Sequence, residues 1–126
     1  MISSDQASKT VLVVEDDDVL RRLVRQCLEA AGYHVADAAD GYLGLAEFKR
    51  LSRVGMVLTD VRMPNMDGIA LAQEVRDIDC ELPILFMSGS DVEADLGHGC
   101  IQKPFHFGEL VARVQRILPV NIAQTG

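Results

Sequence analysis

Short runs of β-branched and other apolar residues alternate with longer segments of helical periodicity along most of the chain. The apolar runs are mostly continuous, as expected for strands that are covered on both faces of a parallel sheet. They predict five strands, at Val11 to Val14, His34 to Ala38, Met56 to Thr59, Ile84 to Met87 and Cys100 to Gln102. We therefore expect an α/β domain built on a five-stranded parallel sheet.

The segments between these strands predict amphipathic helices. From Leu20 to Ala31, apolar residues recur at spacings of three and four, with arginines on the opposite side. Asp18 is predicted to cap the start of this helix, and Gly32 to follow its end. Comparable patterns predict helices at Gly41 to Leu51, Ile69 to Ile78 and Phe107 to Leu118. Only the 11 residues 89–99 separate Ser88 from the last predicted strand, so the fourth helix is expected to be short or irregular and its segment mobile.

Composition narrows the classes of partner and compartment. The 126 residues suit one domain, and the formal charge of -7 argues against a nucleic acid or an anionic membrane as the main direct partner. Three distant cysteines, Cys27, Cys80 and Cys100, have no zinc-site spacing and indicate reduced thiols in a cytoplasmic protein. The polar start and the lack of a long apolar run predict neither a secretion signal nor a membrane span.

Four of the five predicted strands carry polar groups at their carboxyl ends, and only the second does not. The first strand ends in Glu15, Asp16, Asp17 and Asp18, and the third in Thr59 and Asp60. The fourth ends in Ser88 and Gly89, and the fifth in Lys103 and Pro104. In an open parallel sheet the ligand site lies at the carboxyl ends of the strands, so these residues are expected to meet. Each has an ordinary structural explanation when taken singly, as a helix cap, a turn or a surface dipeptide. Their joint position at one sheet edge favours a functional site instead.

The acids at this edge call for a cation. Two carboxylates about 5 Å apart repel by roughly 3 kcal/mol at an effective dielectric of about 20, and one lysine cannot neutralise three acids. A hard divalent ion that takes oxygen ligands, such as Mg²⁺, would do so. A nucleophilic carboxylate, a hydroxyl and an ammonium group are also what phosphoryl transfer needs around the moving group.

The motifs "VLVVEDDDVLRRLV", "LTDVRMPNMDG", "ILFMSG" and "IQKPF" resemble those of the receiver domain of two-component response regulators, over Lys9 to Leu118. The resemblance implies a flavodoxin-like, doubly wound sheet of order 2-1-3-4-5. It implies that Asp60 accepts a phosphoryl group from a histidine kinase or a histidine phosphotransferase. The domain itself would catalyse both this transfer and the later hydrolysis, without any separate enzyme activity.

The resemblance also assigns roles to the other residues of the edge. Glu15, Asp16, Asp60 and the backbone carbonyl of Arg62 would bind Mg²⁺. Ser88 would bond a phosphoryl oxygen, Gly89 would leave room for the phosphoryl group, and Lys103 would pair with Asp60 or its phosphoryl oxygens. A cis peptide bond is expected before Pro104.

One departure from the family concerns Cys100, which occupies the place of an aromatic switch residue. A thiol buries too little surface to bias a conformational equilibrium strongly. Together with the short segment 89–99, this predicts that phosphorylation acts by ordering that segment. Since this region is the family's usual output face, the oligomeric state is left open.

Two alternative functions make different demands on the same residues. A degenerate receiver that acts only as a binding module would have lost one of the site residues, and none is lost. A phosphatase of the haloacid dehalogenase type expects an acid two residues after its nucleophile, where this chain has Arg62. The expected organisation is a flexible tail at 1–8, a receiver domain at 9–118 and a tail at 119–126 that is too short to fold as an effector. The short segment and "IQKPF" ending resemble receivers of hybrid sensor kinases.

Overall fold

Five parallel strands form one sheet in the order β2-β1-β3-β4-β5 in the computed structural model, which describes residues 9–51, 53–89 and 99–120. The strands are β1 (Thr10–Val14), β2 (His34–Ala38), β3 (Met56–Asp60), β4 (Ile84–Ser88) and β5 (Cys100–Gln102). The predicted flavodoxin-like sheet and its strand order are therefore confirmed. Two strands run one residue further than predicted, so that Asp60 and Ser88 are the last residues of β3 and β4.

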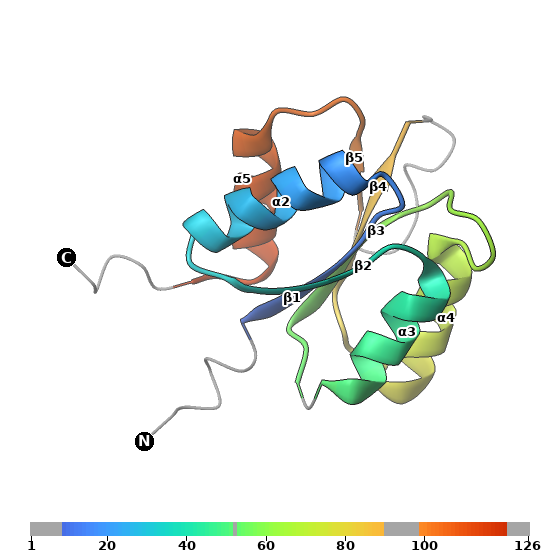
Figure 1. Cartoon of the computed structure of the whole chain (residues 1–126). Coiled ribbons are helices and arrows are strands. Elements are labelled where there is room, and N and C mark those ends of the chain that lie inside the picture. Colours follow the sequence, from blue (N-terminus) through green and yellow to red (C-terminus); the bar gives the residue numbers. More distant parts are fainter. Residues whose placement is uncertain (1–8, 52, 90–98, 121–126) are drawn as a thin grey trace, which may run out of the picture.

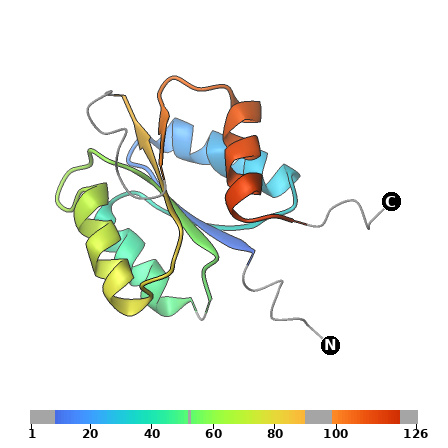
Figure 2. The same ribbon diagram turned by 180° about the vertical axis from the view of Figure 1, so that it is seen from behind.

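Four helices cover the sheet within the described residues. They are α2 (Asp18–Ala30), α3 (Gly41–Arg50), α4 (Gly68–Ile78) and α5 (Phe107–Ile117). Helices α2 and α5 lie on one face of the sheet, and α3 and α4 lie on the other (Figure 1). The view from behind shows the same three layers (Figure 2). The short fourth helix and the ordering switch were predicted for residues 89–99, of which 90–98 lie outside the described residues.

Strand β1 shows why the strand sequences are continuously apolar and do not alternate between apolar and polar residues. Val11 and Val13 belong to the core cluster under α2 and α5, whereas Leu12 and Val14 belong to the cluster under α3 and α4. All four side chains are fully buried. Because successive side chains of a strand point to opposite faces, a strand covered on both faces needs apolar residues at every position.

The ends of α2 are set by local hydrogen bonds. Its N-cap is Asp17, whose carboxylate accepts from the main-chain N–H groups of Val19 and Leu20. The prediction of Asp18 as the cap was wrong, because Asp18 is already the first residue of the helix. Its carboxylate pairs with Arg21 instead. At the other end Gly32 has φ of 105°, and its N–H and that of Tyr33 bond back to the last turn. This is the Schellman arrangement that a glycine favours.

The chain beyond α5 still contacts the domain. Leu118 and Val120 pack against the core cluster under α2 and α5. The main-chain oxygen of Leu118 accepts from the Tyr33 hydroxyl, and that of Pro119 accepts from the Lys9 ammonium group. Lys9, the first described residue, is therefore bonded to Pro119, the last described residue but one. The expected tail 1–8 lies outside the described residues, as do residues 121–126 of the expected tail 119–126.

Candidate functional site

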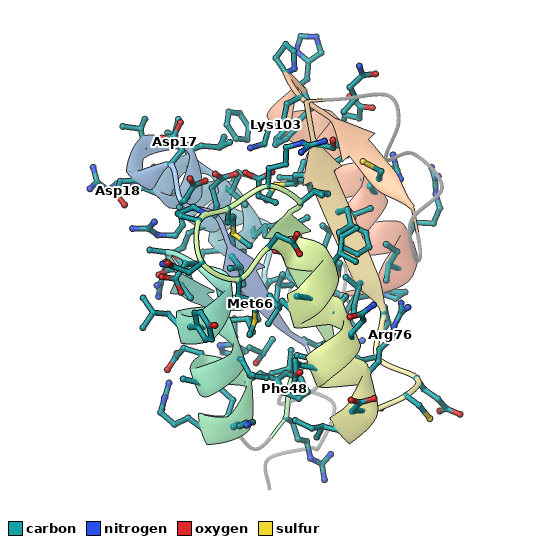
Figure 3. All side chains as sticks on the ribbon, turned by 90° about the vertical axis from the view of Figure 1, so that its right-hand side faces the viewer. Asp17, Asp18, Phe48, Met66, Arg76 and Lys103 are labelled. Carbon is teal, nitrogen blue, oxygen red and sulfur yellow. The ribbon has the colours of Figure 1, made fainter. Side chains whose placement is uncertain are left out.

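The acids and the lysine predicted from the sequence meet at the carboxyl edge of the sheet. Glu15 directly follows β1, Asp60 ends β3, and Lys103 directly follows β5. The Lys103 Nζ atom lies 2.7 Å from Glu15 Oε1 and 3.1 Å from Asp60 Oδ2. Figure 3 shows Lys103 at the same end of the molecule as Asp17 and Asp18, with Phe48 at the opposite end. One ammonium group therefore bridges two carboxylates from two other strands.

Burial makes this ion pair unlike a surface salt bridge. Glu15 is 1% exposed and Asp60 is 8% exposed, whereas the side chain of Lys103 retains 23% of its accessible surface. Carboxylates removed from water are costly unless hydrogen bonds and opposite charges compensate for the lost hydration. Glu15 has such compensation, since its Oε2 atom accepts from the main-chain N–H of Asp17 at 3.0 Å.

The pKa values of Glu15 and Lys103 shift in ways that follow from this burial. Desolvation raises the pKa of the Glu15 carboxyl, although the hydrogen bond from Lys103 and that from Asp17 oppose the rise. Burial of Lys103 favours its neutral form, but the hydrogen bonds and charges of Glu15 and Asp60 together outweigh burial and raise its pKa. Lys103 therefore remains a cation at neutral pH.

Asp16 completes a cluster of three acids. One carboxylate oxygen from each of Glu15, Asp16 and Asp60 lies within 4.8 Å of the other two. Asp16 is exposed, so the cluster opens to solvent on one side. The donor set consists of oxygen atoms alone and carries an excess of negative charge that Lys103 does not balance. This chemistry fits a hard divalent cation such as Mg²⁺, which prefers carboxylate and water ligands.

Ser88 and Gly89 lie at the end of β4, next to this cluster. Strands β3 and β4 pair Asp60 with Met87, so Ser88 extends one residue beyond the acid. The main-chain N–H of Lys103 donates to the Ser88 carbonyl at 2.6 Å, which fixes β5 relative to β4 at this point. Apart from Gly89 itself and its chain neighbours, no described atom lies within 4 Å of the position that a Cβ would take on Gly89. The peptide bond before Pro104 is cis, as expected.

The loop after Asp60 is anchored by buried side chains and main-chain bonds. Val61 and Met63 are buried, and the N–H of Val61 donates to the Met87 carbonyl. The N–H of Gly68 bonds back to the Val61 carbonyl at 2.8 Å, so the loop closes on the residue after Asp60. Arg62 lies in this loop with an exposed side chain. The role of its backbone carbonyl toward a metal stays a prediction.

Two contacts of the Asp60 carbonyl were not foreseen from the sequence. The Thr59 hydroxyl donates to this oxygen at 2.9 Å. A Cβ built on Gly68 would lie 2.1 Å from the same oxygen. The signal for the second contact was the glycine that closes the "MPNMDG" loop, where a tight approach between backbones requires the absence of a side chain.

An apolar cavity borders the charged cluster. It has a volume of about 510 Å³ and is lined by Leu20, Lys103, Pro104, Phe105 and Phe107. The two phenylalanine rings meet edge to face, with centroids 5.9 Å apart. A second cavity of about 460 Å³, lined by Phe48, Leu51, Val54 and Ile78 among others, lies at the end of α3 and α4. Of these two cavities, the first is the one lined by Lys103, the partner of Glu15 and Asp60.

Comparison with known proteins gives concordant matches. Residues 11–115 match the response regulator receiver domain. The chain is 36% identical over 119 residues to the response regulator receiver protein CpdR of Brucella abortus, covering 87% of this chain and 97% of that protein. It is 35% identical to the sensor kinase CckA of the same organism, covering 88% of this chain and 13% of that protein.

Solved structures agree with the sequence matches. The response regulator TrrA of Thermotoga maritima, solved in complex with Mg²⁺ and BeF, superposes with a TM-score of 0.80 at 28% identity, covering 87% of this chain and 99% of that one. The chain spans about half the length of several transcriptional regulatory proteins that it also matches. None of the helices in the described part of the chain combines the length and apolar character needed to cross a membrane.

Proposed function

Because the chain belongs to the response regulator receiver domain family, we propose that Asp60 accepts a phosphoryl group in a two-component phosphorelay, with Mg²⁺ bound at the acidic cluster. The observation that supports this most directly is the meeting of Glu15, Asp16 and Asp60 with Lys103 at one sheet edge. Receivers of phosphorelays are homologous to this chain along most of its length.

In the proposed reaction, a carboxylate oxygen of Asp60 attacks the phosphorus atom of a phosphohistidine. A P–O bond forms as the P–N bond breaks, and the electron pair leaves with the imidazole. Lys103, 3.1 Å from Asp60, stabilises the negative charge of the transferring group. The Ser88 hydroxyl is proposed to bond a phosphoryl oxygen, and Gly89 to leave space for the group.

The metal is proposed to be held by Glu15, Asp16, Asp60 and the Arg62 carbonyl. When bound, Mg²⁺ would supply positive charge that offsets repulsion between the acids and the incoming phosphoryl oxygens. Glu15 orients the site through its bonds to Lys103 and to the Asp17 N–H. Later hydrolysis would break the P–O bond by attack of water on phosphorus, which releases phosphate and restores the Asp60 carboxylate.

The donor is proposed to be a histidine kinase or a histidine phosphotransferase in the cytoplasm. Relatives include a protein of about this chain's length and a much longer sensor kinase. The similarity therefore accommodates both a separate receiver and one within a hybrid kinase. A degenerate receiver, the main alternative, would lack part of the cluster, yet each predicted acid and the lysine is present and in place.

The test is the intact mass of the chain after treatment with a small phosphodonor such as acetyl phosphate. We expect the parent chain to gain one phosphoryl group when Mg²⁺ is present and none when the metal is chelated. Asp60→Asn should remain unlabelled, because the amide keeps the shape but lacks the nucleophile. Asp77→Asn, which changes an exposed aspartate on α4, is the matched control and should label like the parent. Full labelling of Asp60→Asn would reject the proposed acceptor.

A further inference from the structure

Both main-chain polar groups of Glu15, the N–H and the carbonyl, form hydrogen bonds. Its N–H donates to the Ala38 carbonyl of β2 at 3.1 Å. Its carbonyl oxygen accepts from Arg21 Nη1 at 2.8 Å. The first bond belongs to the continuation of the sheet, whereas the second comes from a side chain one turn into α2. Arg21 is thus the residue that fixes the peptide group between Glu15 and Asp16 from outside the strand.

Arg21 is itself held by two other acids. Its Nη2 atom lies 2.7 Å from Asp18 Oδ1, and its Nε atom lies 3.9 Å from Asp37 Oδ1. The side chain is only 19% exposed. A guanidinium group is planar, and its donors keep a fixed angular relation, so these contacts define the direction of Nη1. The group connects the ends of β1 and β2 to the first turn of α2.

The hydrogen bond from Arg21 to the Glu15 carbonyl matters more for the position of the Asp16 side chain than for that of the Glu15 side chain. The Glu15 carboxylate has its own bonds to Lys103 and to the Asp17 N–H. Asp16 is exposed, and within the described residues its carboxylate has no hydrogen-bond or ion-pair partner. The orientation of its main chain therefore decides where its oxygen lies, and the Glu15 carbonyl is part of the peptide group that sets this orientation.

We propose that Arg21 is a positioning residue for the acidic pair Glu15 and Asp16. By holding the Glu15 carbonyl, it keeps the Asp16 oxygen within reach of the Glu15 and Asp60 oxygens, so that all three acids can contact one cation. This inference rests on the proposed metal site. It assigns Arg21 no contact with the metal or with the phosphoryl group.

The positioning role and the charge of Arg21 act in opposite directions. Arg21 is a cation near a site for a cation, so removing its charge should by electrostatics alone strengthen the binding of Mg²⁺. Removing the hydrogen bond from Arg21 to the Glu15 carbonyl should weaken that binding, because the three acids would no longer be held within reach of one cation. Residues that orient metal ligands typically contribute 10- to 100-fold to metal affinity. The direction of the change therefore separates the two effects.

The experiment measures Mg²⁺ affinity by calorimetry on the full chain, with circular dichroism to show that each variant is folded. We expect Arg21→Gln and Arg21→Lys each to bind Mg²⁺ about tenfold more weakly than the parent. Lysine keeps the charge but cannot reach the Glu15 carbonyl and Asp18 with one rigid group. A merely structural role would change the unfolding midpoint without changing the affinity of the folded protein.

Arg25→Gln is the matched control. Arg25 lies one turn further along α2 and pairs with Asp37 and Glu29, but it does not contact Glu15. The affinity of the Arg25→Gln variant for Mg²⁺ should equal or exceed that of the parent. The double variant Glu15→Gln/Asp16→Asn removes two carboxylates, and its Mg²⁺ affinity is the value expected when the proposed metal site is lost.

Two results would overturn the inference and are distinguishable. Equal or tighter binding by folded Arg21→Gln would reject the role of Arg21 and leave the metal site intact. Parent binding no tighter than that of the double variant would reject the proposed metal site and the role of Arg21 together.

Discussion

Gly68 lies against the main chain of Asp60, and this contact controls how closely α4 can approach the end of β3. A Cβ at this position would lie 2.1 Å from the Asp60 carbonyl oxygen and 3.1 Å from its carbonyl carbon. Both atoms belong to the backbone of a buried strand, so no side-chain rotation can relieve the overlap. The glycine is required for space at the residue that carries the proposed chemistry.

Gly68→Ala is therefore expected to destabilise the fold by about 1–3 kcal/mol, the usual range for overpacking. Urea unfolding followed by circular dichroism would measure the loss. Gly108→Ala is the matched control, because Gly108 also lies in the first turn of a helix but a Cβ there meets nothing within 4 Å. We expect this control to be as stable as the parent or more so, since alanine favours helix over glycine. Equal midpoints for the two variants would contradict the account of Gly68.

The sequence predicted residue identities better than residue contacts. Asp60, Ser88 and Lys103 were expected at one edge because the carboxyl ends of parallel strands converge, and the structure has them there. The choice of Asp17 over Asp18 as the cap of α2 was missed. Both residues have the same capping chemistry, and only the extended backbone of Asp17 (φ −78°, ψ 111°) distinguishes them.

At the scale of elements, Tyr33 connects the end of α2 to the end of α5. Its hydroxyl donates to the carbonyl of Leu118, the C-cap of α5. Burial raises the pKa of Tyr33 to about 12. The folded protein thus holds this proton at pH values where the unfolded chain, with the ordinary tyrosine pKa near 10, releases it. The stability associated with Tyr33 is complete below pH 10 and is lost as pH rises toward 12.

Tyr33→Phe should lower the free energy of unfolding by about 1 kcal/mol at neutral pH, through the lost hydrogen bond. The difference between parent and variant should then narrow as the pH rises from 10 to 12. Urea unfolding at several pH values would measure both effects. Tyr42→Phe serves as the control, since the Tyr42 side chain is 60% exposed and loss of its hydroxyl should change the free energy of unfolding little at neutral pH. If Tyr33→Phe kept the full alkaline slope of the parent, the proposed titration of Tyr33 would be wrong.

The periodicity of apolar residues predicted the positions of helices and strands well, but not the hydrogen-bond partners of their polar side chains. The helical spacing from Leu20 to Ala31 identified α2 and its buried face, because the core imposes that spacing. The outward arginines of the same helix carried no such signal. Arg21 reaches back six residues to the Glu15 carbonyl, and this contact depends on where the loop before α2 places the carbonyl. A contact of this kind is decided by loop geometry, which sequence patterns do not specify.

At the scale of the whole molecule, the layered fold separates stability from chemistry. Two apolar clusters on opposite faces of the sheet hold the strands, while the charged groups gather where the strands end. A parallel sheet brings residues 15, 60 and 103 together although they are far apart in sequence. The net charge of -7 and the unbalanced acids at this edge both favour a cation there.

We expect Asp60, and no other acid of the site, to carry the phosphoryl group. Reduction of an acyl phosphate with borohydride converts the phosphorylated aspartate into homoserine and releases phosphate. Trypsin should then release the fragment Val54 to Arg62, in which Asp60 is the only acidic side chain.

Mass spectrometry of the digest is the most direct measurement. After treatment with acetyl phosphate and Mg²⁺, homoserine should occur at position 60 in this fragment, and it should be absent when the metal is chelated. Reduction found instead in the fragment that contains Glu15 and Asp16, or metal-independent labelling of position 60, would contradict the account.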